Sequence, residues 1–461
     1  MQNGMETAKY TRGRSREGEL PKGRSLESRN TAAPLAAAPE MASRRAWLED
    51  FRHMLSSEAI DFERLRTRCF QGCPDGEGIR ATCWKILLGY LPPDTSSWEA
   101  VLESKRALYH QLVKETIINP HEDEESDSGE VVDHPLNPNP ESSWNRFFVD
   151  NQVLLQIDHD TRRLYPDLSF FQQPTPYPRA SYSAGMEALK KRVERSSLPS
   201  QRVGTTRMGI INMKSTAKYS SLEKYYLPLK EGEEAHWEVV ERILFVHAKC
   251  NKGIGYVQGM NEVIGPLYYV FFQHPDVRWK EHAEADTSFC FSALMAEIGD
   301  VFTKKLDSAH LGIGGAMRSL MQLLKDKDPV LSKNFVKKGV EPQFFGFRWI
   351  TLLLSQEFLL PELMRIWDSL FADANRFDFL LYMCCSMIIS VREKLIAGDF
   401  AEAVKLLQVY TVFIPGPQET GLVTIEQFIV GCSASSLSSS CAKRPFLFVG
   451  TLSSRSCIRT R

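Results

Sequence analysis

Helical periodicity is the feature that most restricts how this chain can fold. Between His236 and Lys249, apolar residues recur at steps of three and four, the spacing of one face of an α-helix. Acidic residues precede this segment and Lys252-Gly253 follows it, as expected where a helix starts and stops. Segments 349–354 and 361–371 show the same pattern, the second with proline in its first turn. Because alternating strand patterns are scarce, we predict an all-α fold.

The composition of the chain divides it into a helical body and several polar regions. Residues 1–41 lack a sustained period, which predicts a flexible leader, and amphipathic helices are expected from about residue 44. The body should extend over 44–410, with polar inserts at about 120–141 and 172–234. Residues 411–461 contain a serine-rich stretch and form an atypical low-complexity tail.

Charge and cysteine usage exclude several classes of function. The 461-residue chain has a formal net charge of −1, so we expect no nucleic acid partner. Its ten cysteines are scattered through helical segments with no secretory segment ahead of them, which favours a reduced, cytoplasmic setting. Cys69 and Cys73 form a CxxxC, but no second pair or nearby histidine completes a zinc set, so we predict buried thiols and no metal. The most apolar run, 379–391, is too short for a transmembrane segment and predicts a core helix.

The string Ile157–Arg163 carries a carboxylate and a guanidinium at a spacing that lets them interact. On a helix, Asp160 lies about one turn before Arg163 and can hold its guanidinium in orientation. A lone DxxR is more often a surface ion pair than a catalytic device. Arg162 is adjacent, but only Arg163 has the spacing I-x-x-D-x-x-R.

A second string, Gly255–Asn261, places Gln258 between glycines. The amide of Gln258 can accept and donate hydrogen bonds at once. Gly255 and Gly259 allow positive φ or close approach of a partner, Tyr256 is expected to pack beside the glutamine, and Asn261 is expected to cap the following helix. The glycines resemble a phosphate-binding loop, but they follow a helix, and no Lys-Ser or Lys-Thr completes the motif. Alone, the string could equally be a turn with a solvent-facing glutamine.

Together the two strings resemble the IxxDxxR and YxQ signatures of TBC domains, a family that inactivates Rab GTPases. Further blocks similar to those of the family follow in its order and cover about residues 72–408. The resemblance implies a two-lobed helical TBC domain with long polar inserts. Four further residues are expected to be supporting ones, through core packing or a buried ion pair: Arg80, Trp84, Trp367 and Asp368. For Arg80 the resemblance implies indirect support of the active face, and core packing is equally open.

The family resemblance implies a GTPase-activating protein for a GTP-bound Rab partner, one that supplies Arg163 and Gln258 in trans and is not itself an enzyme. The arginine would neutralise charge on the transferred phosphoryl group, and the glutamine would take the place of the GTPase's own glutamine. We expect no cofactor of its own, because GTP and Mg²⁺ come with the partner. We also expect cytoplasmic residence, recruitment to endomembranes through the Rab, and a role in vesicle trafficking. The alternative is a noncatalytic TBC scaffold that binds a Rab or other partners, and the intact motifs favour the activator.

Overall fold

The computed structural model describes part of the chain, namely residues 37–117, 134, 137, 139–178, 189–194, 229–230, 232–302 and 312–410. The chain divides into two compact units, Met1–Glu49 and Asp50–Arg461, and helix α1 (Ala37–Leu55) crosses the boundary between them. Most of the predicted leader and of the two inserts lies outside the described residues, as does the whole predicted tail.

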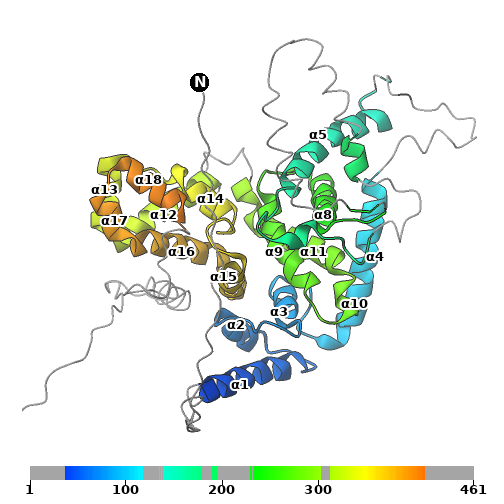
Figure 1. The fold of residues 1–461 in the computed structure, drawn as a ribbon, viewed down its shortest axis with the longest axis horizontal. Coiled ribbons are helices and arrows are strands. Elements are labelled where there is room, and N and C mark those ends of the chain that lie inside the picture. Colours follow the sequence, from blue (N-terminus) through cyan, green and yellow to red (C-terminus); the bar gives the residue numbers. More distant parts are fainter. Residues whose placement is uncertain are drawn as a thin grey trace, which may run out of the picture. The chain divides into compact units, whose positions relative to one another are not determined.

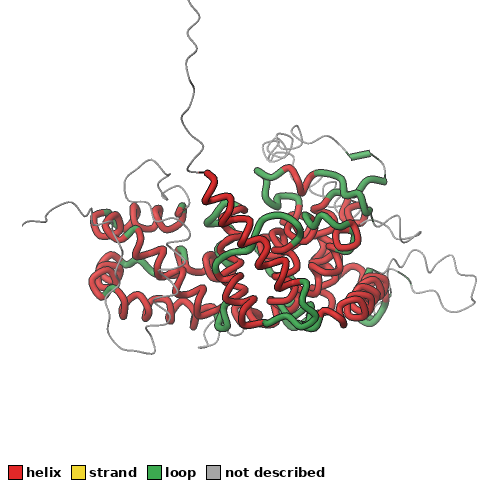
Figure 2. The backbone as a smooth tube through the Cα atoms, turned by 90° about the horizontal axis from the view of Figure 1, so that it is seen from below, coloured by secondary structure: helices red, strands yellow, loops and turns green. Residues whose placement is uncertain are grey.

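Helices make up all the regular structure of the described residues, which contain no strand and only two isolated bridges (Figures 1 and 2). The predicted all-α fold is confirmed. Short 3-10 helices lie at Thr95–Ser97, Ser169–Gln172 and Pro342–Phe344. The α-helices of the second unit are α2 (Phe62–Phe70), α3 (Ile79–Leu87), α4 (Trp98–Thr116), α5 (Ser143–Thr161), α8 (His236–Cys250), α9 (Met260–Phe272), α10 (Val277–Lys280), α11 (Ala283–Phe302), α12 (Ile313–Lys327), α13 (Pro329–Lys338), α14 (Gly346–Thr351), α15 (Leu360–Ala372), α16 (Arg376–Ser390), α17 (Arg392–Ala397) and α18 (Phe400–Gln408).

Two of the three helices expected from periodicity form as predicted. Helix α8 covers the segment from His236, and α15 begins at Leu360 with proline in its first turn. The expectation is wrong for residues 352–354, because α14 ends at Thr351 and Leu353 and Leu354 take φ values of 49° and 65°. All three leucines are buried, so tertiary packing overrides their helical propensity. Helix α1 also begins earlier than expected, at Ala37.

The helices of the second unit pack in two groups, which agrees with the expected two-lobed architecture. In the first group α11 contacts α4, α8 and α9, α8 also contacts α4 and α9, and α5 packs on α8 and α9. In the second, α12 contacts α13, α14 and α16, and α17 contacts α13 and α18. Helix α15 packs against α2, α3 and α16. Helix α8 is buried along nearly its whole length, so it provides a rigid support for α5 and α9.

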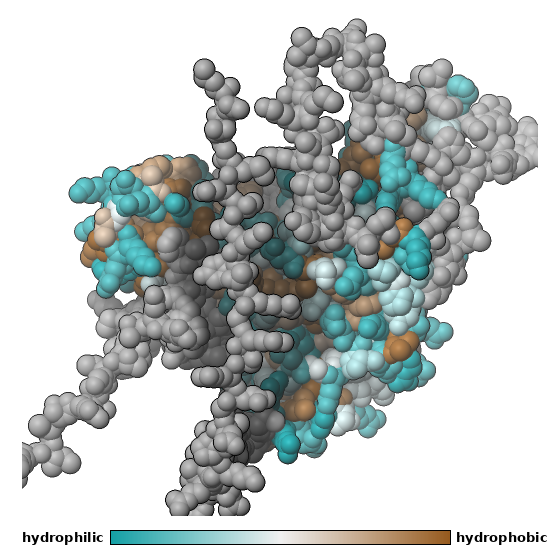
Figure 3. Space-filling model, viewed as in Figure 1, coloured by the Kyte–Doolittle hydropathy of each residue, from teal (hydrophilic) through white to brown (hydrophobic). Residues whose placement is uncertain are grey.

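No helix in the described part of the chain is both long and apolar enough to cross a membrane. On the face drawn in Figure 3, polar residues predominate and apolar ones gather in smaller patches. The apolar run predicted as a core helix is α16, which is largely buried.

Candidate functional site

The side chain of Arg163 lies just beyond the carboxyl end of α5 and is 52% exposed. Its Nη2 donates to Asp160 Oδ1 at 3.2 Å, so the predicted pairing of these two residues is present. Its Nε donates to the carbonyl oxygen of His159 at 3.1 Å, and Nη2 lies 2.8 Å from His159 Nδ1. The guanidinium is thus oriented from one side, while about half of the side chain faces solvent.

The neighbouring Arg162 has a different role. Its Nε donates to both carboxylate oxygens of Asp158, at 2.9 and 2.8 Å. Its guanidinium lies over the ring of Trp237 on α8, 4.6 Å from the centroid. Arg162 therefore fastens α5 to α8, and Arg163 is the more exposed of the two arginines.

The glutamine segment between α8 and α9 is joined to the arginine through a single carboxylate. Gln258 is exposed, and both flanking glycines have positive φ, 66° at Gly255 and 101° at Gly259. The hydroxyl of Tyr256 donates to Asp160 Oδ2 at 2.8 Å across 96 positions of sequence. Asp160 thus holds Arg163 with one oxygen and the Gln258 segment with the other.

Asn261 does not cap the following helix, contrary to the expectation. Helix α9 begins at Met260, and Gly259 occupies the cap position in the left-handed conformation. Asn261 lies inside the first turn, where its Nδ2 donates to the carbonyl oxygen of Asp160 at 3.3 Å and to Glu262 Oε1 at 3.1 Å. It therefore ties the start of α9 to the end of α5.

The loop Leu352–Leu354 supports the glutamine segment, and the sequence analysis missed it. A Cβ atom on Gly259 would lie 2.6 Å from Leu352 Cδ2, so the loop packs directly against that glycine. The loop is held in turn by Trp367, whose Nε1 donates to the carbonyl oxygen of Leu353 at 2.9 Å. No local signal predicts this contact, because three consecutive leucines indicate a helix.

Glu262 is a second carboxyl group of the site that the sequence analysis missed. Burial raises its pKa to about 7, the Asp160 carboxylate adds to the rise, and the Asn261 hydrogen bond and the Arg163 charge oppose it. Burial and the Asp160 carboxylate also raise the pKa of Tyr256, which keeps its hydroxyl protonated as a donor. The position of Glu262 was the available signal in the sequence, because it lies in the first turn of α9, where acidic residues are favoured.

The four residues predicted as supporting lie together in the core. Arg80 Nε donates to Asp368 Oδ1 at 3.0 Å, and Trp84 Nε1 donates to the same oxygen at 2.8 Å. The Trp84 and Trp367 rings lie 6.0 Å apart, and Asp368 is fully buried. The structure shows both of the arrangements left open for these residues, core packing between the two tryptophans and a buried ion pair between Arg80 and Asp368. Their connection to the site is indirect, through the Trp367 hydrogen bond to the loop Leu352–Leu354.

A third cysteine joins the CxxxC pair. The sulfur atoms of Cys69, Cys73 and Cys83 lie within 4.8 Å of one another, and all three side chains are buried. Cys83 has no local sequence signal for this contact, because it lies on the next helix, α3. A tetrahedral zinc site needs a fourth ligand, and in the described part of the chain no histidine or carboxylate joins this group.

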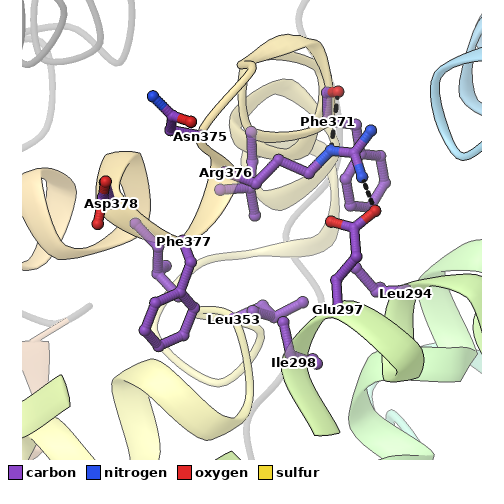
Figure 4. A pocket seen from close by; sticks show the side chains of 11 residues that line it. Leu294, Glu297, Ile298, Leu353, Phe371, Asn375, Arg376, Phe377 and Asp378 are labelled. Atoms are coloured by element: carbon purple, nitrogen blue, oxygen red, sulfur yellow. Dashed lines mark hydrogen bonds and ion pairs between the residues drawn. The ribbon is translucent and has the colours of Figure 1, made fainter. Parts of the chain in front are cut away.

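A cavity of about 240 Å³ lies between α11, α15 and α16 (Figure 4). Its walls are mostly apolar, and Arg376 there bonds Glu297 and the carbonyl oxygen of Phe371. Leu353 is the residue it shares with the loop described above. None of the predicted site residues lines it, so we locate the candidate site at Asp160 instead.

The fold and the two motifs define a class: an all-α domain that presents an arginine and a glutamine from segments joined at one carboxylate. A family model described as Rab-GTPase-TBC domain matches residues 223–396. The chain is 52% identical to TBC1 domain family member 13 of Mus musculus over 375 residues and of Homo sapiens over 376, covering 79% of this chain and 94% of each relative. A TBC domain-containing protein of Schizosaccharomyces pombe is 35% identical, covering 79% of this chain and 70% of that relative. The chain therefore belongs to the Rab-GTPase-TBC domain family.

A solved structure agrees with this assignment at the level of the fold. The Ypt/Rab-GAP domain of Gyp1p superposes with a TM-score of 0.59, covering 86% of this chain and 98% of that one, at 22% sequence identity. The sequence resemblance to TBC domains is confirmed by these comparisons.

Proposed function

We propose that this protein accelerates GTP hydrolysis by a Rab-family GTPase, to which it supplies Arg163 and Gln258 in trans. The observation that carries the proposal is the double role of Asp160, whose two oxygens bond Arg163 and Tyr256. Arg163 and the segment that carries Gln258 are in this way both bonded to one buried group, whose side chain is 7% exposed.

Arg163 supplies the charge that a GTPase alone lacks. An arginine provided in trans raises the rate of hydrolysis by ~10³ to 10⁵, or about 4 to 7 kcal/mol of barrier. Lysine would not replace it, because only the planar guanidinium can bond several phosphate oxygens at fixed geometry. The exposure of Arg163 and its attachment through Asp160 allow it to enter a nucleotide site while its orientation is kept.

Gln258 orients the attacking water in place of the GTPase's own glutamine. Its amide accepts from the water and donates to a phosphate or backbone oxygen. Tyr256 and the left-handed Gly259 fix the segment on either side. GTP and Mg²⁺ arrive with the partner. Recruitment to endomembranes through that Rab and a role in vesicle trafficking complete the proposal.

The test is single-turnover GTP hydrolysis by a panel of purified Rab proteins with wild type, Arg163→Ala, Gln258→Ala and Arg146→Ala. Arg146 is the matched control, a 58% exposed arginine on the same helix that pairs with Glu141. We expect wild type and R146A to accelerate the same Rabs, and R163A to lose about a thousandfold or more in rate. Full activity of folded R163A would overturn the mechanism.

The scaffold alternative gives a different result in a binding experiment. An activator binds a Rab carrying GDP and a phosphoryl transition-state mimic more tightly than one carrying GDP alone, because its contacts are strongest in the transition state. A scaffold shows no such preference. GTP-dependent binding by folded wild type without acceleration would assign the scaffold function.

A further inference from the structure

The outward face of α5 carries a row of exposed side chains. Phe148, Gln152, Leu155 and His159 follow one another at steps of four, three and four residues, which places them on one side of the helix. Phe148 is 44% exposed and Leu155 38%. The other side, with residues such as Leu154, is buried, and α5 packs there against α8. We call these four residues the α5 stripe.

The α5 stripe ends at the candidate site. Its last member, His159, contacts the guanidinium of Arg163 through both its carbonyl oxygen and Nδ1. With a rise of about 1.5 Å per residue, Leu155 lies about 12 Å from Arg163 along α5 and Phe148 about 22 Å. A small globular domain is about 30 Å wide. A partner centred on Arg163 therefore reaches about 15 Å along the helix, which covers Leu155 and ends short of Phe148.

The chemistry of this face fits a protein surface. Val149, beside the α5 stripe, is 62% exposed, and the exposed neighbours Gln152 and Gln156 are uncharged amides. The charged side chains on or beside this part of α5 are paired: Asp150 with Lys249 at 2.6 Å, Arg146 with Glu141, Arg162 with Asp158 and Arg163 with Asp160. Exposed apolar side chains with a hydrogen-bonding rim are typical of protein–protein contacts, whereas nucleic acids and anionic membranes require clustered lysine and arginine.

We propose that the part of the α5 stripe from Gln152 to His159 is a docking surface for the face of the GTP-loaded Rab that adjoins its nucleotide, with Leu155 as the apolar side chain of the contact. The inference rests on the proposed function, because it takes Arg163 as the group that enters the nucleotide site. Contacts along the stripe are the same before and during the reaction. They contribute affinity and leave the chemical step unchanged.

The test compares Leu155→Glu with Val336→Glu, a matched control at an 80% exposed valine on α13. Single-turnover hydrolysis is followed at increasing concentrations of the protein, which separates the half-saturating concentration from the rate at saturation. We expect L155E to raise the half-saturating concentration at least tenfold, with the rate at saturation within twofold of wild type. V336E should change neither. The milder Leu155→Gln, a good helix former, shows the same trend if L155E fails to fold.

The outcomes separate failure of the stripe from failure of the proposed function. An unchanged half-saturating concentration in folded L155E, with R163A still inactive, overturns the stripe and leaves the activator function standing. Loss of the saturating rate alone also overturns it, because that result indicates a displaced Arg163.

If wild type accelerates no Rab, the proposed function fails. The stripe is then judged by binding to Rab loaded with a nonhydrolysable GTP analogue, and equal binding by wild type and L155E overturns it. Self-association that L155E abolishes, without an effect on Rab, assigns the face to a second copy and overturns the proposal.

Discussion

At the scale of single residues, the site depends on Asp160. Its side chain accepts from Arg163 and Tyr256, and its carbonyl oxygen accepts from Asn261, so three segments meet at one residue. A carboxylate buried to this degree is stable only when its partners are in place. The protonation of its neighbour Glu262 therefore matters to the same site.

Replacing Glu262 by Gln should change how stability depends on pH. Burial raises the pKa of Glu262 to about 7 in the folded protein, against about 4.3 in the unfolded chain. Between these values the folded state holds a proton that the unfolded state has released, so the free energy of unfolding falls as pH rises to about 7. E262Q cannot ionise, and it should be more stable than wild type by about 1 to 3 kcal/mol at pH 8 and should lack this decline.

Urea denaturation at pH 5, 6, 7 and 8 measures the effect of E262Q. Glu99→Gln, at an exposed position in the first turn of α4, is the control and should follow the wild-type pH dependence. A decline from pH 5 to pH 8 as steep in E262Q as in wild type would show that Glu262 does not titrate in this range.

At the scale of secondary-structure elements, both proposed catalytic residues lie just outside a helix. Arg163 follows the end of α5, and Gln258 precedes the start of α9. Loops on a rigid support expose side chains to a partner without moving them. Helix α8 contacts both α5 and α9 and provides this support.

Gly259→Ala should displace the segment that carries Gln258, whereas Gly339→Ala, the same substitution at another glycine with positive φ, should not. Alanine at φ 101° is strained, and its Cβ would meet Leu352 at 2.6 Å. Gly339, at the end of α13, has φ 73° with nothing within 4 Å of a Cβ. We expect G339A to lose about 1 kcal/mol of stability, G259A to lose more because its Cβ also meets Leu352, and only G259A to lose activation of GTP hydrolysis. Thermal unfolding and single-turnover hydrolysis measure the two effects. Equal activation by G259A and G339A would contradict this prediction.

At the scale of the whole molecule, buried ion pairs join distant parts of the second unit. Asp368 on α15 accepts from Arg80 and Trp84 on α3, across 288 and 284 positions. Asp286 on α11 accepts from Lys85 on α3 at 2.6 Å and from Arg106 on α4 at 3.0 Å. These contacts fix the register between helices that pack mainly through apolar surfaces.

Asp368→Asn should destabilise the fold strongly, because it removes the buried carboxylate that accepts from Arg80 and Trp84 and leaves Arg80 only its exposed carboxylate partner Asp75. Breaking a buried pair costs about 3 to 5 kcal/mol. The control Asp326→Asn, at an exposed position on α12, should change the free energy of unfolding by less than about 0.5 kcal/mol. Urea denaturation gives both values. At a temperature where D368N is folded, its rate of activation should equal that of wild type, and a selective loss of activation would instead give Asp368 a direct role at the site.

Interactions between near neighbours are the part of this structure that could be predicted from sequence. The periodicity of α8 and α15 places their buried faces, and three residues of separation bring Asp160 and Arg163 together, because helix geometry depends on residues i to i+4. The bond from Tyr256 to Asp160 and the convergence of Cys83 on Cys69 and Cys73 have no such local origin.

The left-handed turn at Leu353–Leu354 and the displacement of Asn261 from the cap position were also decided by packing between distant segments. Sequence by itself therefore determined the helical class, the family and the candidate arginine and glutamine. Only the tertiary structure decided how they are held together, because burial and long-range contacts there outweigh local preference.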